Sequence, residues 1–353
     1  MAVKIPSHTR ETTRMGGQTV KSSYLALVAL ALASVLTPNA SRAEVSTIRL
    51  AKQYGLAYLP LTVMQEEQLL EKEAAKSGQT VKTEWLQFSA GSGMNEALLS
   101  GNLDVASGGV GPMLTIWSRT LKNYKIRGIS AMASLPLYLV TVNPKVKSLA
   151  DFGTADKIAM PTVKTSIQAI TLQMAAEKQF GKGQATKLDP LTVSLSHPDA
   201  QVAMLGGKAG ITSHFGSSPF QEMELKDPRV HQVLDSYQVL DGPHTFSVAW
   251  ATDKFVTGNP KIVAAFYAAL KESINLINSD PKTAASLWIK GDRLKLSEED
   301  AETIIKNPEN KWTTEPQKLL VFLNGMHAAG LINDTTSNWK DLFFTYVHDT
   351  KGS

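Results

Sequence analysis

The sequence predicts an α/β fold with two similar Rossmann-like lobes, and two observations carry this prediction. The first is an internal duplication, because residues 88–107 align without a gap with residues 194–213. Its matched pairs are Ala97/Ala203, Leu99/Leu205, Gly101/Gly207 and Ser107/Ser213. The second is the alternation of short strand-like and helical patterns, which is typical of a mostly parallel sheet covered by helices. Ligands of such sheets bind in loops beyond the strand ends, so two facing lobes predict a clamp.

The first part of the chain alternates between strands and helices. The expected strands are residues 46–51, 82–88, 104–107, 127–133 and 137–142. Pro60 is suited to the first position of a helix, and the apolar residues that follow it recur at helical spacing. A second helix is expected at 93–100, and the glycine-rich turn 108–111 follows the third strand.

The second part repeats this alternation and then becomes helical. Its expected strands are residues 157–160, 192–195, 210–212, 229–235 and 244–252, the last returning to the first lobe. A helix is expected at 166–180, where Gly181 ends it. Further helices are expected at 260–277, 282–289, 297–306, 316–329 and 339–347.

The expected path of the chain gives discontinuous lobes. Crossings are predicted near 133–145 and 236–246, and each is a candidate hinge. Lobe one would then hold residues 44–135 and 245–353, and lobe two would hold residues 136–244.

The first 43 residues read as a cleaved signal peptide. Lys21 precedes an apolar run of 13 residues, Tyr24–Leu36, and Ser41-Arg42-Ala43 is a small-residue cleavage site. The run is shorter than the roughly 20 residues of a membrane span. We therefore expect export to a bacterial periplasm, with translation starting at Met1 or Met15.

Charge and cysteine content narrow the function. The formal charge of the whole chain is +4, but the leader holds most of the excess basic residues, and its removal leaves the mature chain formally neutral. We therefore predict no nucleic-acid partner. The chain has no cysteine, which excludes thiolate nucleophiles, thiolate metal sites and a lipid-modified cysteine. We expect no metal and no cofactor.

Two expected helix starts suggest an anion site. A helix N-terminus carries unpaired N–H groups and a partial positive charge, which suit an anion. One such end lies in each lobe, and nearby hydroxyls and a lysine could add donors. The candidate residues are Ser89, Ser92, Gly93, Lys164, Thr165 and Ser166. Ordinary helix capping is the alternative, because Ser and Thr are preferred there.

Five further residues are candidates for ligand contact. Gly109 would let the backbone approach a ligand, or would only form a tight turn. Tyr54 and Tyr58 would flank an organic ligand, or Tyr58 would pack under the helix. His214 and His244 would donate hydrogen bonds into the cleft, or would lie at the surface.

Four stretches of the chain resemble one protein family. They are Gly55–Leu61, Ala97–Val105, Ser148–Phe152 followed by Lys157–Pro161, and Phe246–Leu276. They resemble the periplasmic solute-binding proteins of ABC importers, in the nitrate, sulfonate and taurine group that includes pyrimidine-precursor binders. The resemblance implies the bilobed periplasmic-binding-protein fold, a ligand between the lobes, an ABC permease in the inner membrane as partner, and no catalysis. Gly210 stands where the first copy has Asp104, so the loop 213–216 need not bind as the family's loop does.

The expected function is capture of a small organic anion by a monomeric, unanchored protein. The preferred candidate ligands are a sulfonate, taurine and nitrate. Bicarbonate, a pyrimidine precursor and an aromatic acid remain alternative ligands. The alternative is an enzyme on the same scaffold, such as a lyase or dehydratase. It would need an acid–base pair, and the predicted cleft loops contain none. A role in ligand sensing beside a receptor also stays open.

Overall fold

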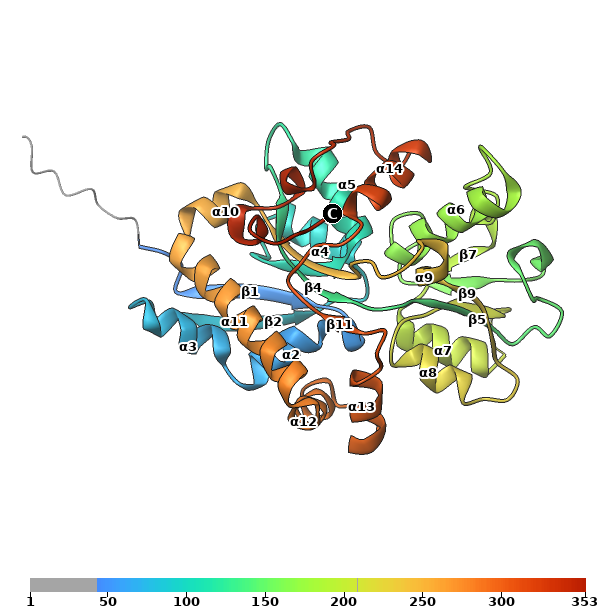
Figure 1. Cartoon of the computed structure of the whole chain (residues 1–353), viewed down its shortest axis with the longest axis horizontal. Coiled ribbons are helices and arrows are strands. Elements are labelled where there is room, and N and C mark those ends of the chain that lie inside the picture. The colour runs from blue at the N-terminus through green and yellow to red at the C-terminus, as the bar shows by residue number, and fades with distance from the viewer. Residues whose placement is uncertain (1–42, 208) are drawn as a thin grey trace, which may run out of the picture. The chain divides into compact units, whose positions relative to one another are not determined.

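The computed structural model describes residues 43–207 and 209–353, which form a mixed α/β structure (Figure 1). The predicted signal peptide falls on residues that lie, apart from Ala43, outside this part. Within the described residues, no helix combines the length and apolar character that a membrane crossing requires.

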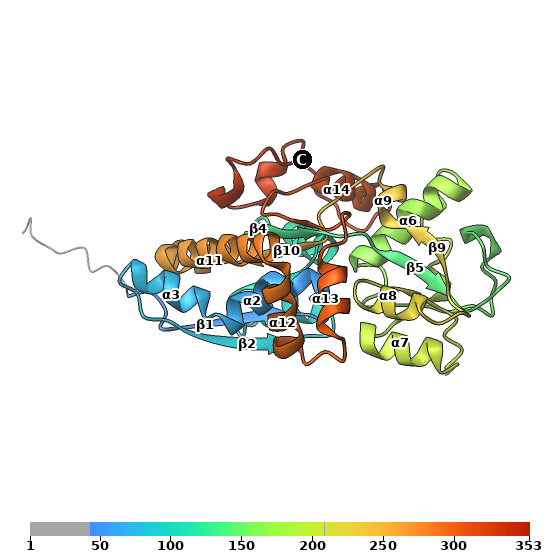
Figure 2. The same cartoon turned by 60° about the horizontal axis from the view of Figure 1, so that its bottom comes forward.

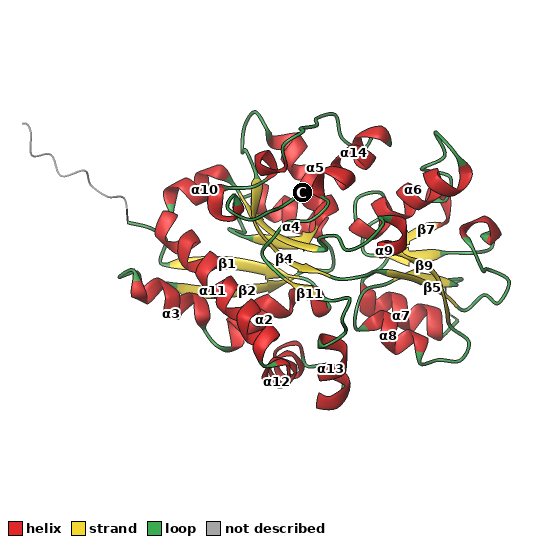
Figure 3. Cartoon of the chain, in the orientation of Figure 1, coloured by secondary structure: helices red, strands yellow, loops and turns green. Residues whose placement is uncertain are grey.

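Three sheets form the framework, and Figure 3 shows their strands in yellow. The strands are β1 (Thr47–Lys52), β2 (Lys82–Gln87), β3 (Ala106–Gly109), β4 (Arg127–Ser134), β5 (Tyr138–Thr141), β6 (Ile158–Met160), β7 (Thr192–Ser194), β8 (Ser213–Phe215), β9 (His231–Asp235), β10 (Ser247–Ala251) and β11 (Lys311–Trp312). β1 and β2 form a two-stranded sheet. Four further strands form a second sheet of order β11-β4-β10-β3. The third sheet has the order β7-β6-β8-β5-β9.

Helices cover these sheets. They are α2 (Leu59–Glu66), α3 (Leu69–Lys76), α4 (Gly91–Leu99), α5 (Val110–Thr120), α6 (Ile167–Phe180), α7 (His197–Leu205), α8 (Phe220–Leu225), α9 (Ser236–Val239), α10 (Asp253–Gly258), α11 (Pro260–Ser279), α12 (Pro281–Asp292), α13 (Glu298–Ile305) and α14 (Leu319–Ala328). Figure 2 shows α7 and α8 on one face of the third sheet, and α6 and α9 on the other. This third sheet and its helices form the second half of the molecule described below.

The chain passes between the two larger sheets twice. It leaves β4 for β5 through residues 135–137, and returns from β9 to β10 through residues 236–246. The predicted return of the apolar strand at 244–252 is confirmed, because β10 pairs with β3 and β4. The exact division into lobes stays a prediction.

Several local expectations were wrong. The sheets are not mostly parallel, since every strand pair of the four-stranded sheet is antiparallel and β5 runs antiparallel to β8 and β9 in the third sheet. β8 begins at Ser213, not at 210, because Gly210 adopts a left-handed turn with φ 68°. Residues 339–347 form two short 3₁₀ turns instead of a helix. The helix after Pro60 is interrupted at Gln68, whose φ of 52° starts α3 anew.

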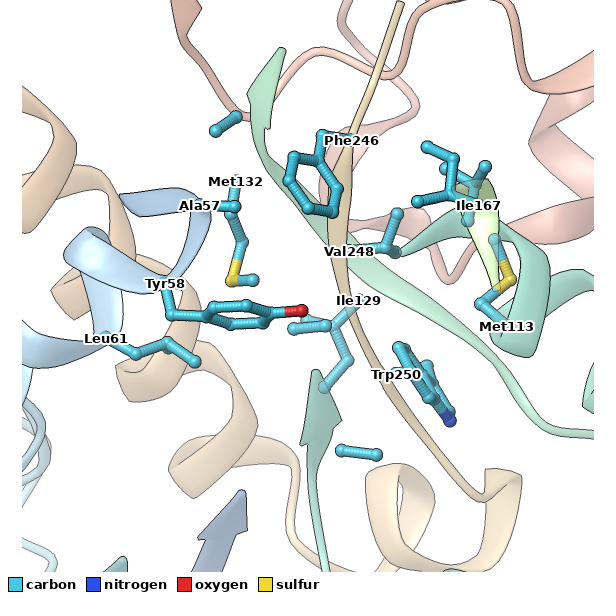
Figure 4. Packing of buried hydrophobic residues seen from close by; sticks show 14 of the residues in the cluster. Ala57, Tyr58, Leu61, Met113, Ile129, Met132, Ile167, Phe246, Val248 and Trp250 are labelled. Carbon is cyan, nitrogen blue, oxygen red and sulfur yellow. The ribbon is translucent and has the colours of Figure 1, made fainter. Parts of the chain in front are cut away.

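One continuous apolar core supports the first half and extends toward the second. Trp250, Phe266 and Phe343 are fully buried in it. Figure 4 shows Ile167 of α6 near Val248 and Met113, so the start of α6 packs on this core. Apolar contacts thus fix the position of the start of α6, which lines the candidate site described below.

Candidate ligand-binding crevice

A narrow crevice lies where the two halves meet. One half contributes Gln53, Tyr54, Tyr58, Gly91, Gly109, Pro112 and Phe246. The other half contributes Pro161, Thr162, Ser166, Ile167, Gln168 and His197. Its volume is about 20 Å³, which is room for about one water molecule. A larger solute can therefore enter only if the halves separate.

Four helix N-termini meet at this crevice. Gly91 is the first residue of α4, Gly109 is the N-cap of α5, Ser166 is the N-cap of α6 and His197 is the first residue of α7. Neither α4 nor α5 has a side-chain cap, although the Val110 N–H at the start of α5 donates to the Phe246 carbonyl oxygen at 3.2 Å. Each helix end adds a partial positive charge.

The crevice has no compensating acid. Among the described residues, its lining contains no Asp, Glu, Lys or Arg. The helix ends therefore determine the sign of its local field, and that sign favours an anion.

Glycines allow the two halves to approach closely. A Cβ on Gly109 would lie 2.8 Å from Cγ2 of Ile167, and one on Gly111 would lie 2.4 Å from the carbonyl oxygen of Thr165. The N–H of Leu56 also donates to the carbonyl of Ser218 across the halves, at 2.8 Å. The halves can therefore approach this closely because Gly109 and Gly111 have no side chain at these contacts.

Two tyrosines form part of the first wall. Tyr54 is 40% exposed, whereas Tyr58 is 3% exposed. Figure 4 shows Tyr58 with Leu61, Met132 and Ile129 around its ring. Burial raises the pKa of the Tyr58 phenol. Tyr58 thus packs in the core and also lines the crevice. The two roles expected from the sequence, ligand contact and packing under the helix, are therefore compatible.

The structure brings five of the predicted residues to the crevice or beside it. Tyr54, Tyr58, Gly109 and Ser166 line it directly. Ser92 lies beside it, with its hydroxyl 3.4 Å from that of Thr162 in the other half. Ser166 also caps α6, because its hydroxyl accepts a hydrogen bond from the Ala169 N–H at 3.2 Å.

Other predicted residues lie elsewhere. Thr165, together with Ser92, lines a neighbouring pocket of about 270 Å³. Ser89 and Lys164 are exposed and do not line the crevice. Gly93 lies inside α4, where a Cβ would face Phe88 at 3.3 Å.

The two predicted histidines are buried and do not reach the crevice. His214 lies in β8 and is fully buried. His244 is also fully buried, where its Nε2 lies 2.9 Å from the Ser236 hydroxyl. Burial lowers the pKa of His214 to about 3 and that of His244 to about 4.

Nine residues of the crevice lining were missed in the sequence analysis. Among them are Gln53, Gln168 and His197, whose side chains carry hydrogen-bonding groups. A signal for His197 was present, because the duplication aligns it with Gly91 of the first copy. Gln168 lies two residues after the predicted cap Ser166, and no pattern distinguished it.

A hydrogen-bonded chain begins at the crevice and enters the second half. Nε2 of His197 lies 3.3 Å from Nε2 of Gln168, and Nδ1 of His197 lies 2.8 Å from Nε2 of His214. Nδ1 of His214 lies 2.6 Å from Oε1 of Glu224, which is fully buried. Burial raises the pKa of Glu224 to about 9, and burial followed by repulsion from His214 holds the pKa of His197 well below 6.5.

Comparison with solved structures identifies the architecture. The alkanesulfonate-binding protein SsuA from Xanthomonas axonopodis pv. citri, bound to MOPS, matches with a TM-score of 0.65 and 17% identity over 83% of this chain and 96% of that one. The nitrate-binding protein NrtA from Synechocystis PCC 6803 matches with a TM-score of 0.63 and 16% identity over 83% and 84%. A Candida albicans protein described as having the generic periplasmic binding protein fold matches with a TM-score of 0.62 and 16% identity over 85% and 96%.

The likeness is one of structure and not of sequence. No family model matches the chain, and no curated protein matches it. The solved structures match over most of both chains, so this chain has the periplasmic-binding-protein fold, the fold that these periplasmic sulfonate- and nitrate-binding proteins share.

Proposed function

We propose that this chain is the extracytoplasmic solute-binding component of an ABC importer and that it captures a small anion in the crevice. The observation that carries the proposal is the convergence of four helix N-termini on a crevice without an acidic lining residue. The fold supports the role, because the SsuA and NrtA structures share it.

The ligand class follows from the walls of the crevice. Helix ends supply N–H donors for an oxyanion, as expected for a sulfonate or nitrate. Tyr54 and Tyr58 supply aromatic surface for an organic group. We therefore propose a small sulfonate first, and nitrate second.

Capture requires movement of the two halves. A crevice of about 20 Å³ does not admit a sulfonate, so the halves open around the two crossings and close on the ligand. A ligand that contacts both halves favours closure by its differential affinity for the closed state. Delivery to a permease, export through a cleaved leader and a monomeric state complete the proposal.

An enzymatic role has less support from the site. The titratable residues that line the crevice are His197, Tyr54 and Tyr58. Proton transfer between substrate and protein would need an acid and a base that both reach the substrate. Glu224 and His214 lie behind the wall, so they do not supply that pair.

A thermal-shift screen tests the proposal. The purified protein without residues 1–43 is heated with taurine, ethanesulfonate, nitrate, bicarbonate, orotate or benzoate, with glucose as the neutral control. A ligand at 100 times its Kd stabilises the native state by about 2.7 kcal/mol, which raises Tm by several degrees. The proposal fails if no anion raises Tm, or if glucose alone does. Small-angle scattering should also show a smaller radius of gyration with the anion that binds.

A further inference from the structure

We propose that Gln53 determines which anions the crevice accepts, because its amide oxygen faces the crevice as a hydrogen-bond acceptor. The ligand that fits is then a small sulfonate that also carries a neutral donor, such as a hydroxyl group. The inference rests on the proposed anion-binding function and narrows its ligand class.

Gln53 lies where the first wall of the crevice meets the sheet. It directly follows β1, at the carboxyl end of that strand, where ligands of α/β sheets bind. Its side chain lines the crevice, and the residue is 8% exposed. An added Cβ on Gly108 would lie 2.7 Å from Nε2 of Gln53, and one on Gly91 would lie 3.7 Å from it. The amide group is therefore held between the end of β3 and the start of α4.

A backbone partner fixes the direction in which this amide faces. Nε2 of Gln53 donates a hydrogen bond to the carbonyl oxygen of Ser107 at 3.3 Å. A backbone carbonyl only accepts, so this contact requires the NH₂ group of Gln53. The reverse orientation would place two oxygens against each other. The hydrogen-bond partner decides the orientation of a side-chain amide, and here that partner does not titrate.

The amide oxygen is left for the crevice. Among the described residues, no group donates to Oε1 of Gln53, and the atom is not sealed from solvent. Because Gln53 lines the crevice, this free acceptor is available to a ligand there. A ligand that fills the crevice displaces solvent from this oxygen and must replace the lost donor.

Tyr58 provides the opposite polarity on the same wall. Its hydroxyl has no hydrogen-bond partner among the described residues and is not sealed from solvent, although the residue is only 3% exposed. Burial raises the pKa of the Tyr58 phenol, so the hydroxyl keeps its proton and can donate. This hydroxyl and the helix N-termini donate to sulfonate oxygens, whereas Gln53 accepts. An anion without a donor group satisfies only part of this wall.

The donor on the ligand is neutral. The crevice lining contains no Asp or Glu among the described residues, and four helix N-termini already give it a positive field. An ammonium group would be buried there without a carboxylate partner. Burying an unpaired charge costs more than burying a hydroxyl that is hydrogen-bonded. A hydroxyl therefore fits Gln53 better than an ammonium group does.

The experiment compares three sulfonates of equal length in the protein without residues 1–43. They are 2-hydroxyethanesulfonate, propane-1-sulfonate and taurine, which carry a hydroxyl, a methyl and an ammonium group at the same position. In the parent protein, calorimetry should show the hydroxyl compound binding about fivefold to a hundredfold more tightly than the methyl compound, since the methyl compound leaves a buried acceptor unpaired. The hydroxyl compound should also bind more tightly than taurine.

Variants test whether Gln53 is the source of this preference. Gln53→Met removes the acceptor at similar side-chain length and should abolish the preference for hydroxyl over methyl. Gln53→Leu is a second variant with the same expectation. The control Gln173→Met removes another buried amide, which bonds to Asp189 and does not line the crevice, so the preference should stay. Both ligands are measured on the same variant, so a general loss of stability does not change their ratio.

Equal binding of the hydroxyl and methyl compounds by the parent would overturn the inference and leave the proposed function standing. An unchanged preference in a folded Gln53 variant would overturn it as well. Tighter binding of taurine than of the hydroxyl compound would overturn the neutral donor. If no sulfonate binds and no other anion raises Tm, the proposed function fails, and the inference fails with it.

Discussion

Gly111 gives the sharpest test of the closed arrangement. It lies in the first turn of α5 and faces the start of α6, where an added Cβ would lie 2.4 Å from the Thr165 carbonyl oxygen and 2.4 Å from Cδ1 of Ile170. Real Cβ atoms essentially never approach within 3.0 Å, so Gly111→Ala forces the helices apart by at least 0.6 Å. The obstacle is partly backbone, which cannot rotate away.

The expected cost follows from overpacking. Inserting a methyl group into a tight contact typically costs about 1–3 kcal/mol. This cost falls on the closed state alone if the contact opens when the halves separate, so anion affinity should fall about 5-fold to 150-fold. Alanine is favoured over glycine in a helix by about 0.5–1 kcal/mol in either state. The free protein should therefore not unfold at a lower temperature.

The assay compares calorimetric Kd values and the radius of gyration with Gly258→Ala as control. Gly258 is also helical, and nothing lies within 4 Å of its added Cβ. The control should bind as the parent does. If Gly111→Ala binds its anion as tightly as the parent and closes to the same radius, the α5–α6 contact does not belong to the ligand-bound state, and the reasoning is refuted.

Three further predictions concern single side chains. Ser166→Ala removes a helix cap and a crevice hydroxyl, so urea unfolding should show a loss of about 1 kcal/mol together with weaker anion binding. The control Ser297→Ala removes the equivalent cap of α13, away from the crevice, and should lose only stability. Burial lowers the pKa of His244 to about 4, so its contribution to the free energy of unfolding is present above pH 6.5 and lost as pH falls toward 4; urea titrations should show a weaker acid dependence in His244→Gln, and an unchanged slope would contradict this. Lys52 is buried and forms an ion pair at 2.7 Å with the partly buried Asp292, so Lys52→Met should cost up to about 3 kcal/mol in urea unfolding, and the double variant with Asp292→Leu should recover much of it.

Local sequence patterns predicted those features that short-range physics controls. Ser166 caps its helix, as the capping alternative expected, and the helix expected from residue 297 begins with Ser297 as its cap, because the capping hydroxyl and its N–H partner are three residues apart. The alternation of strands and helices and the duplication predicted two α/β halves, and the solved neighbours have that fold. Residues 339–347 show where local patterns fail as predictors. Their sequence pattern predicted a helix, but they form only two short 3₁₀ turns.

The crevice itself was decided by tertiary structure. The sequence by itself predicted one helix start in each half, although α4 begins at Gly91 and not at 93, and the fold brings both starts close together with those of α5 and α7. His197 and Gln168 come from segments 29 residues apart, and Gln53 comes from a third segment in the other half. His214 was expected in a loop facing the cleft, but its strand begins three residues later than predicted, which places it behind His197. Caps and periodicity depend on neighbours within one or two turns, whereas a shared crevice depends on how distant segments pack, and a single sequence carries little information about that packing.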